Sequence, residues 1–150
     1  MSAGLEEIKA SVGGEEAVSS WILIDQTLIN GFADVTNDHN YIHVDLEKAA
    51  QSPMGGTIAH GLLKLSMLPS MAFEAMPDNS AFRMGLNYGY DKIRFLTPVR
   101  SNKRIRGRFK VLDFTEIRPG EWRKRVGVTV EIEEEPKPAL VADWITLHYV

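Results

Sequence analysis

The chain has 150 residues and no cysteine, carries a net charge of −3, and is 44% hydrophobic. This length and hydrophobic fraction are typical of one globular domain with an ordinary core, so we expect a single domain over residues 1–150. The slightly negative charge argues against nucleic acid as the main partner, because neutralising phosphates requires a basic surface.

Export and membrane insertion are not expected from this sequence. Residues 1–16 lack the cationic stretch followed by an apolar one that marks a secretory signal. The most apolar segment, Thr57–Met76, contains Lys64, Pro69 and Glu74, which are unusual in a membrane-spanning helix. The lack of cysteine excludes disulfides and fits a reducing compartment, so we expect a cytoplasmic protein.

The N-terminal third predicts short helices and one short strand. Leu5–Ala10 has the pattern of a helix, and Trp21–Ile24 that of a brief strand. Asp25 is a good N-cap for the next helix, and Asp45 can cap one or two turns over Leu46–Ala50. Apolar residues at helical spacing after Asp25 predict one buried face, made of Leu28, Ile29, Phe32 and Val35.

The segment Thr57–Ala75 is apolar on almost every side. A helix of this kind is normally enclosed by other structure, so we expect it at the centre of the fold. Pro69 removes one backbone donor, and we therefore expect a kink or a break near Leu65–Leu68.

The remaining sequence predicts strands. Arg104–Val111 and Arg125–Glu133 alternate between polar and apolar residues, as half-buried strands do. Leu140–Tyr149 is apolar on both faces and is expected in the middle of a sheet. Tyr88–Phe95 changes its apolar phase near Gly89–Asp91, which indicates a bulge. Consecutive strands with short connections favour an antiparallel sheet, so the sequence predicts an α+β fold in which a curved sheet wraps a central helix.

Three polar residues lie close together after the second predicted helix: Asp38, Asn40 and His43. A histidine beside a carboxylate is a common acid–base pair, because the imidazole titrates near neutral pH. Alternatively, Asp38 caps a turn and His43 is a satisfied, partly buried side chain. Asn40 can hold Asp38 or a substrate atom through its amide, or simply face solvent. Asn37 is a residue that tolerates positive φ where a helix must end sharply.

His60 and Gly61 lie where the apolar helix is expected to begin. An unpaired N–H of Gly61 in the first turn can donate to a thioester oxygen as negative charge develops. Alternatively, the glycine only permits close packing of the helix against the sheet. His60 is expected to pack or hydrogen-bond there. A metal site with Asp38 and His43 is not expected, because the spacing resembles no standard zinc pattern.

A basic stripe follows one strand and consists of Lys103, Arg104, Arg106, Arg108 and Lys110. The stripe is most simply the solvent face of an outer strand. Part of it, or Arg94 on another strand, can instead meet the phosphates of a long anionic ligand.

The residues around this cluster resemble the signature of the MaoC-like, or (R)-specific, enoyl-CoA hydratase family. The matching residues are Phe32, the run TNDHNYIH at residues 36–43, Ala49, and the run GTIAHG at residues 56–61. The family has glycine where this chain has Asn37, and proline where it has Tyr41. These variants are most similar to the NodN-like subgroup.

The resemblance implies a hot-dog fold and a hydratase that adds water reversibly to a trans-2-enoyl-CoA, giving a (R)-3-hydroxyacyl-CoA. It implies Asp38 and His43 as the catalytic pair, the Gly61 N–H as the oxyanion donor, and Asn40 and His60 as supporting residues. It also implies a homodimer, an acyl-CoA ligand, and neither a metal nor another cofactor. Two alternatives are a hot-dog thioesterase and a non-catalytic acyl-thioester binding protein.

Overall fold

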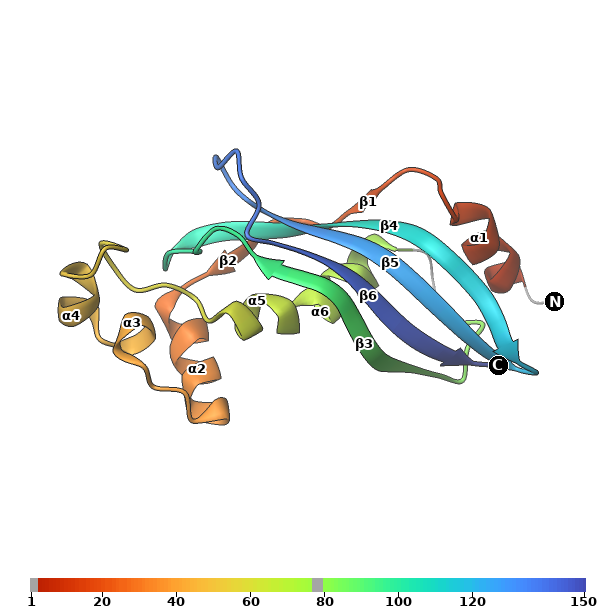
Figure 1. Ribbon diagram of the computed structural model, residues 1–150, viewed down its shortest axis with the longest axis horizontal. Helices are drawn as coiled ribbons and strands as arrows, with labels where there is room; N and C mark the ends of the chain where they lie inside the picture. Colours follow the sequence, from red (N-terminus) through yellow and green to blue (C-terminus); the bar gives the residue numbers. More distant parts are fainter. Residues whose placement is uncertain (1–2, 77–79) are drawn as a thin grey trace.

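A computed structural model describes residues 3–76 and 80–150, and its largest feature is a curved sheet (Figure 1). The strand order is β1-β4-β5-β6-β3, β2 also pairs with β4, and every pairing is antiparallel. The predicted antiparallel sheet is therefore confirmed. The strands are β1 (Ala17–Val18), β2 (Ile22–Ile24), β3 (Met84–Phe95), β4 (Lys103–Arg118), β5 (Glu121–Ile132) and β6 (Leu140–Tyr149).

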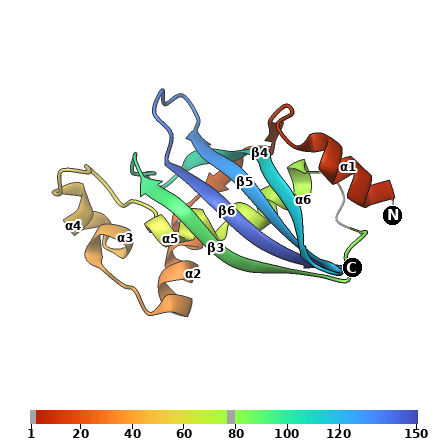
Figure 2. The ribbon, with the colours of Figure 1, turned by 45° about the vertical axis from the view of Figure 1, so that its right-hand side comes forward.

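Six helices accompany the sheet among the described residues. Helices α5 and α6 run along the concave face, α2 to α4 gather at one end, and α1 lies at the other (Figures 1 and 2). None of the helices within these described ranges has the length and apolarity that crossing a membrane requires. The helices are α1 (Ala3–Ser11), α2 (Gln26–Thr36), α3 (Tyr41–Val44), α4 (Leu46–Ala50), α5 (Gly61–Ser66) and α6 (Leu68–Ala75).

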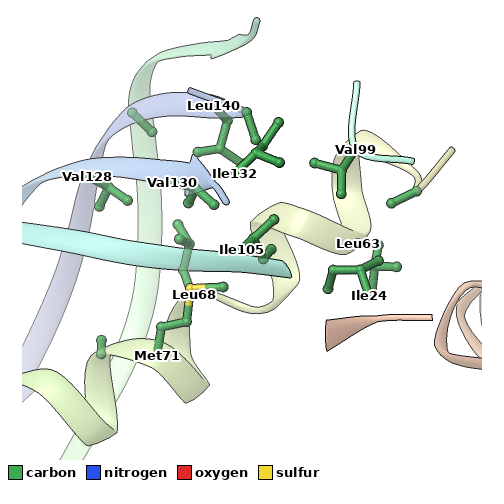
Figure 3. Packing of buried hydrophobic residues seen from close by; sticks show 14 of the residues in the cluster. Ile24, Leu63, Leu68, Met71, Val99, Ile105, Val128, Val130, Ile132 and Leu140 are labelled. Atoms are coloured by element: carbon green, nitrogen blue, oxygen red, sulfur yellow. The ribbon is translucent and has the colours of Figure 1, made fainter. Parts of the chain in front are cut away.

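The core lies between α5–α6 and the concave face of the sheet (Figure 3). Along β5, side chains alternate strictly between buried and half-buried, because successive residues of a strand point to opposite faces. Leu68 and Met71 of α6 are fully buried against inward residues such as Ile105, Val130 and Leu140. The alternation read from the sequence therefore places this apolar face against the helices.

The central helix agrees with the prediction in its break and differs from it in two other respects. It is two helices that meet at Met67, which agrees with the expected break. Residues 57–60 are extended rather than helical, because Ile58 forms a β-bridge with Arg100. The helix pair is also not enclosed on every side: Leu62 is 61% exposed and Phe73 is 78% exposed, since no described element covers the side away from the sheet.

Of the predictions for α2 and β6, some are confirmed and others are wrong. The Asp25 carboxylate accepts from the Leu28 N–H at 2.8 Å, so the predicted N-cap is confirmed. Val35 is wrong as a buried residue, because the core side of α2 presents Ile29 and Ala33. Strand β6 does lie between β5 and β3, but its outward side chains Val141 and Leu147 are only half-buried.

The predicted irregularity in β3 is present as two register shifts against β6. One lies between Asn87 and Gly89 and the other between Asp91 and Arg94, so they flank the predicted position. Each shift lets a strand bend and re-aim its side chains. Strand β3 is therefore a bent edge strand of the sheet.

Gly107 of β4 tests how tightly the core is packed. A Cβ there would lie 2.6 Å from the ring of Phe109, which is buried, and 3.1 Å from the sulfur of Met71. We expect Gly107→Ala to lower the free energy of unfolding by about 1–3 kcal/mol, as overpacking does. The control is Gly31→Ala in α2, where a Cβ meets nothing within 4 Å and where we expect a gain of about 0.5–1 kcal/mol. Urea unfolding of both variants measures this, and equal stabilities would contradict tight packing at Gly107.

Candidate active site

The site begins at the sharp end of α2. Asn37 adopts the left-handed conformation with φ 56°, and its N–H donates to the carbonyls of Ala33 and Asp34. The next N–H, that of Asp38, also donates to the Ala33 carbonyl at 3.0 Å. Positive φ at Asn37 is confirmed, and it turns the chain so that Asp38 leaves the helix on an exposed loop.

His43 lies on α3 and is buried. Its Nδ1 is 2.7 Å from the Ile58 carbonyl oxygen, which only accepts, so Nδ1 carries the proton and Nε2 carries the lone pair. The Nε2 atom makes no hydrogen bond among the described residues, and it is not one of the buried atoms sealed from solvent. Burial lowers the pKa of His43, although the Ile58 bond acts in the opposite direction. The imidazole is therefore neutral at pH 7, with a basic nitrogen available.

His60 supports this pair from the residue before α5. Its Nε2 donates to the backbone carbonyl of Asp38 at 3.0 Å, and its ring stacks on that of His43 with centroids 3.7 Å apart. Phe32 closes the other side of the His60 ring at 4.9 Å. The expected packing and hydrogen bonding of His60 at the start of the helix are confirmed.

These contacts bring three side chains together. One ligand-type atom from each of Asp38, His43 and His60 lies within 4.8 Å of the other two. A metal bound by histidine lies close to the plane of each ring, but the His43 and His60 rings are stacked at 22° with centroids 3.7 Å apart. The arrangement therefore fits an acid–base pair better than a shared metal ion, and the absence of a metal stays a prediction.

Gly61 is the first residue of α5, so its N–H is one of those without a partner inside the helix. A Cβ at this position would lie 3.3 Å from the Phe95 ring of β3. The close-packing interpretation of this glycine is thus confirmed. The two interpretations are compatible, because the small residue leaves room for Phe95 and keeps side-chain bulk away from the amide.

Asn40 has a different contact from the one expected. Its side-chain oxygen accepts from the Ile42 N–H at 3.3 Å and caps α3. The contact with the Asp38 carboxylate comes from the Asn40 backbone N–H, at 3.4 Å. A side-chain amide grip on Asp38 is therefore wrong, because the amide oxygen serves the start of α3.

The basic stripe is the solvent face of β4. Arg104 pairs with Glu133, and both Arg106 and Arg108 pair with Glu131. Arg108 also lies 3.6 Å from Glu16, so three carboxylates face the three arginines on the outer side of the sheet. The stripe therefore gives little support for a phosphate site.

A second polar cluster, which was not predicted from the sequence, lines a cavity. A cavity of about 320 Å³ lies between α6 and strands β3, β5 and β6, and its lining includes Lys124, Thr146 and His148. Burial lowers the pKa of Lys124 to about 8. The alternation of the strands could have revealed this cluster. All three residues occupy inward positions of β5 or β6, where apolar residues are expected.

Lys64 was also missed. It lies one turn after Gly61, is buried, and places its Nζ 3.4 Å from the Thr97 carbonyl oxygen and 5.5 Å from the centre of the Phe95 ring. Burial lowers the pKa of Lys64 to about 8.

Comparison with known proteins identifies the family. The MaoC like domain matches residues 7–135. The chain is 49% identical over 144 residues to nodulation protein N of Rhizobium meliloti, covering 95% of this chain and 89% of that protein. It is 38% identical over 139 residues to 3-hydroxyacyl-thioester dehydratase Z of Mycobacterium tuberculosis, covering 93% of this chain and 91% of that protein.

A solved structure has a similar fold. The (R)-hydratase from A. caviae involved in PHA biosynthesis has a TM-score of 0.73 to this chain at 17% identity, over 89% of this chain and 93% of that one. The fold similarity confirms the α+β hot-dog prediction. The chain therefore belongs to the MaoC-like dehydratase family and has the hot-dog fold.

Proposed function

We propose that this protein is a hydratase that adds water reversibly to a trans-2-enoyl-CoA and gives a (R)-3-hydroxyacyl-CoA. The observation that carries the proposal is the pairing of a neutral imidazole with a carboxylate. His43 keeps its Nδ1 proton on Ile58 and presents Nε2, and the Asp38 side chain lies within 4.8 Å. The relative named as a 3-hydroxyacyl-thioester dehydratase supports the same reaction class.

In the proposed mechanism, Asp38 and His43 hold one water molecule. The pair takes a proton from that water as its oxygen attacks C3, and it returns a proton to C2. The roles of acid and base are assigned to the pair as a whole. The Gly61 N–H donates to the thioester oxygen as the enolate forms, and removing such a donor typically costs ~3 kcal/mol in the barrier. No metal or other cofactor takes part.

The supporting residues act by position. His60 fixes the backbone of Asp38 and stacks on His43, so it limits the rotation of both groups. Asn40 caps the short helix that carries His43 and contacts Asp38 through its backbone. A constellation held this way needs little reorganisation as the reaction proceeds.

The substrate's acyl tail would lie along α5 and α6. The cavity beside α6 has the volume of a small-molecule pocket and is lined mainly by apolar side chains such as Met76, Leu86 and Trp144. The thioester would then lie at Gly61, with the CoA portion outside. A cytoplasmic location remains a prediction.

We also propose a homodimer formed through β3. This strand is at the edge of the sheet, and exposed apolar residues follow it: Met84, Leu86, Tyr88 and Phe95. A long apolar edge strand is a template for pairing with another chain. The exposed Leu62 and Phe73 of α5 and α6 extend the same apolar character, so a second copy would cover both surfaces.

The first test removes each member of the pair. We expect Asp38→Asn and His43→Ala each to lower crotonyl-CoA hydration by at least 10²-fold, because general acid–base catalysis contributes about 10²–10⁴-fold. The matched controls are Asp34→Asn and His39→Ala, since the side chains of these residues form an exposed hydrogen bond nearby at 2.8 Å. Loss of enoyl absorbance measures activity, and circular dichroism checks the fold.

Three results would contradict the proposal. Near-normal turnover in either variant would remove the pair from the mechanism. Release of free CoA thiol by the wild type would indicate a thioesterase. Tight acyl-CoA binding without any loss of enoyl absorbance would indicate a binding protein.

The second test is the pH dependence of kcat/KM. Burial lowers the pKa of His43 from 6.5, so the neutral form is favoured and persists to lower pH than in a free histidine. If neutral His43 is required, kcat/KM is level near pH 7 and falls about tenfold per pH unit only below a midpoint under 6.5. A midpoint at or above 6.5 would contradict this role, and the residual activity of His43→Ala should lack this limb.

The third test concerns the dimer. We expect the wild type to sediment at twice the mass of one chain, and Leu86→Lys combined with Tyr88→Lys to sediment as a monomer. Charged residues on an edge strand oppose pairing with a second edge. Leu112→Lys is the control, because Leu112 is similarly exposed at 41% but lies on β4, away from that edge. A monomeric wild type at micromolar concentration would overturn the proposal.

A further inference from the structure

Part of the lining of the cavity beside α6 is polar. Lys124 of β5 and Thr146 of β6 are cross-strand neighbours, and His148 is the next inward residue of β6. Each of the three is less than a tenth exposed, although the rest of the lining is mostly apolar. Burying polar groups costs free energy unless hydrogen bonds compensate. Their presence together in the lining of a cavity therefore calls for a chemical explanation.

The hydrogen bonds of this cluster are incomplete. Thr146 Oγ1 and His148 Nε2 are 2.8 Å apart, but His148 Nδ1 is buried and has no partner among the described residues. The ring lies against Phe82, and a Cβ at Gly85 would be 3.3 Å from Nδ1. Burial and the nearby Lys124 lower the pKa of His148 to about 4. At pH 7 the imidazole is neutral, so one ring nitrogen donates and the other accepts.

This neutrality determines which ligand group fits. If His148 Nε2–H donates to Thr146, the threonine hydroxyl proton is available to another acceptor. If Thr146 donates to Nε2 instead, the threonine oxygen can accept from another donor. A hydroxyl group on a ligand satisfies Thr146 in both cases, because a hydroxyl both donates and accepts. The methyl end of a plain chain satisfies neither case.

The polar part of the cavity also lies at a plausible distance from the proposed thioester position. Pro69 and Ala72, which line the cavity, come 8 and 11 residues after Gly61. At 1.5 Å of rise per helical residue this corresponds to roughly 12–17 Å along α5 and α6. A medium-length acyl chain spans such a distance.

We propose that this cavity selects acyl chains that carry a hydroxyl group at the end far from the thioester, and that Thr146 and His148 recognise it. The placement of the thioester rests on the proposed function. Recognition of the chain end does not, because it depends only on Thr146 and His148, two side chains of β6. A purely apolar cavity has the opposite preference, since it leaves a buried hydroxyl without a partner.

Calorimetric titration with saturated thioesters tests the proposal without any turnover. The probes are octanoyl-, decanoyl- and dodecanoyl-CoA, each compared with its ω-hydroxy counterpart. We expect the hydroxylated chain to bind about three- to tenfold more tightly at the length that reaches Thr146, as one net hydrogen bond provides. Equal or tighter binding of the plain chain at all three lengths would overturn the proposal.

A variant pair assigns the preference to the cluster. Thr146→Val keeps the shape of the side chain and removes the hydroxyl, and we expect it to abolish or reverse the preference. The control is Thr129→Val, because Thr129 points to the outer face of β5. The ratio of two affinities is insensitive to a general loss of stability, so a preference that survives in Thr146→Val would contradict the assignment.

Crotonyl-CoA separates the two proposals, because its four-carbon acyl group is too short to reach the polar part of the cavity. Crotonyl-CoA hydration together with no preference for the ω-hydroxy chains refutes only the recognition by Thr146 and His148. A clear preference without any crotonyl-CoA hydration refutes only the hydratase and supports the recognition.

Discussion

The candidate site depends on two hydrogen bonds that join α3 to the extended segment before α5. The Ile58 N–H donates to the Ile42 carbonyl at 3.0 Å, and the Ile58 carbonyl accepts from His43 Nδ1 at 2.7 Å. The first bond fixes the distance between the two segments. The second fixes the tautomer of His43 and therefore which nitrogen faces Asp38. Without an acceptor at this place, the histidine would be buried with no defined direction for its lone pair.

These two hydrogen bonds explain why residues 57–60 are extended and why α5 begins only at Gly61. Residues 57–60 pair with the end of the sheet, through the Ile58–Arg100 bridge and the bond from the Ala59 N–H to the Val99 carbonyl at 2.8 Å. An extended segment directs Ile58 towards α3, whereas a helix over the same residues would use its carbonyl internally. Helix α5 can then begin at Gly61, with its first amides lacking partners inside the helix.

Buried polar side chains lie at the two ends of α5–α6, and at each end one histidine nitrogen, His60 Nδ1 or His148 Nδ1, has no partner among the described residues. At one end, His43 and His60 are each bonded to a backbone carbonyl and stacked on each other. At the other, His148 retains an unpartnered nitrogen beside a cavity. Buried polar atoms are usually bonded, and the hydroxyl of Thr146, which lines the cavity and bonds His148, is the group that a ligand there would meet. The two ends of α5–α6 thus have complementary chemistry: one suits proton transfer, and the other suits recognition.

Much of this structure follows from local sequence, because its causes are local. Asp25 caps α2, Asn37 ends it with positive φ, and the alternation along β5 sets its inner face, since each depends on neighbouring residues. Long-range pairing decided the rest. The apolar Thr57–His60 is extended because it meets Val99 and Arg100, about forty residues later. Arg104, Arg106 and Arg108 of β4 form ion pairs only because Glu16, Glu131 and Glu133, far away in sequence, lie beside them. Likewise, Lys124 and His148 become neighbours only when β5 and β6 pair. The register of that pairing cannot be read from the sequence of either strand alone.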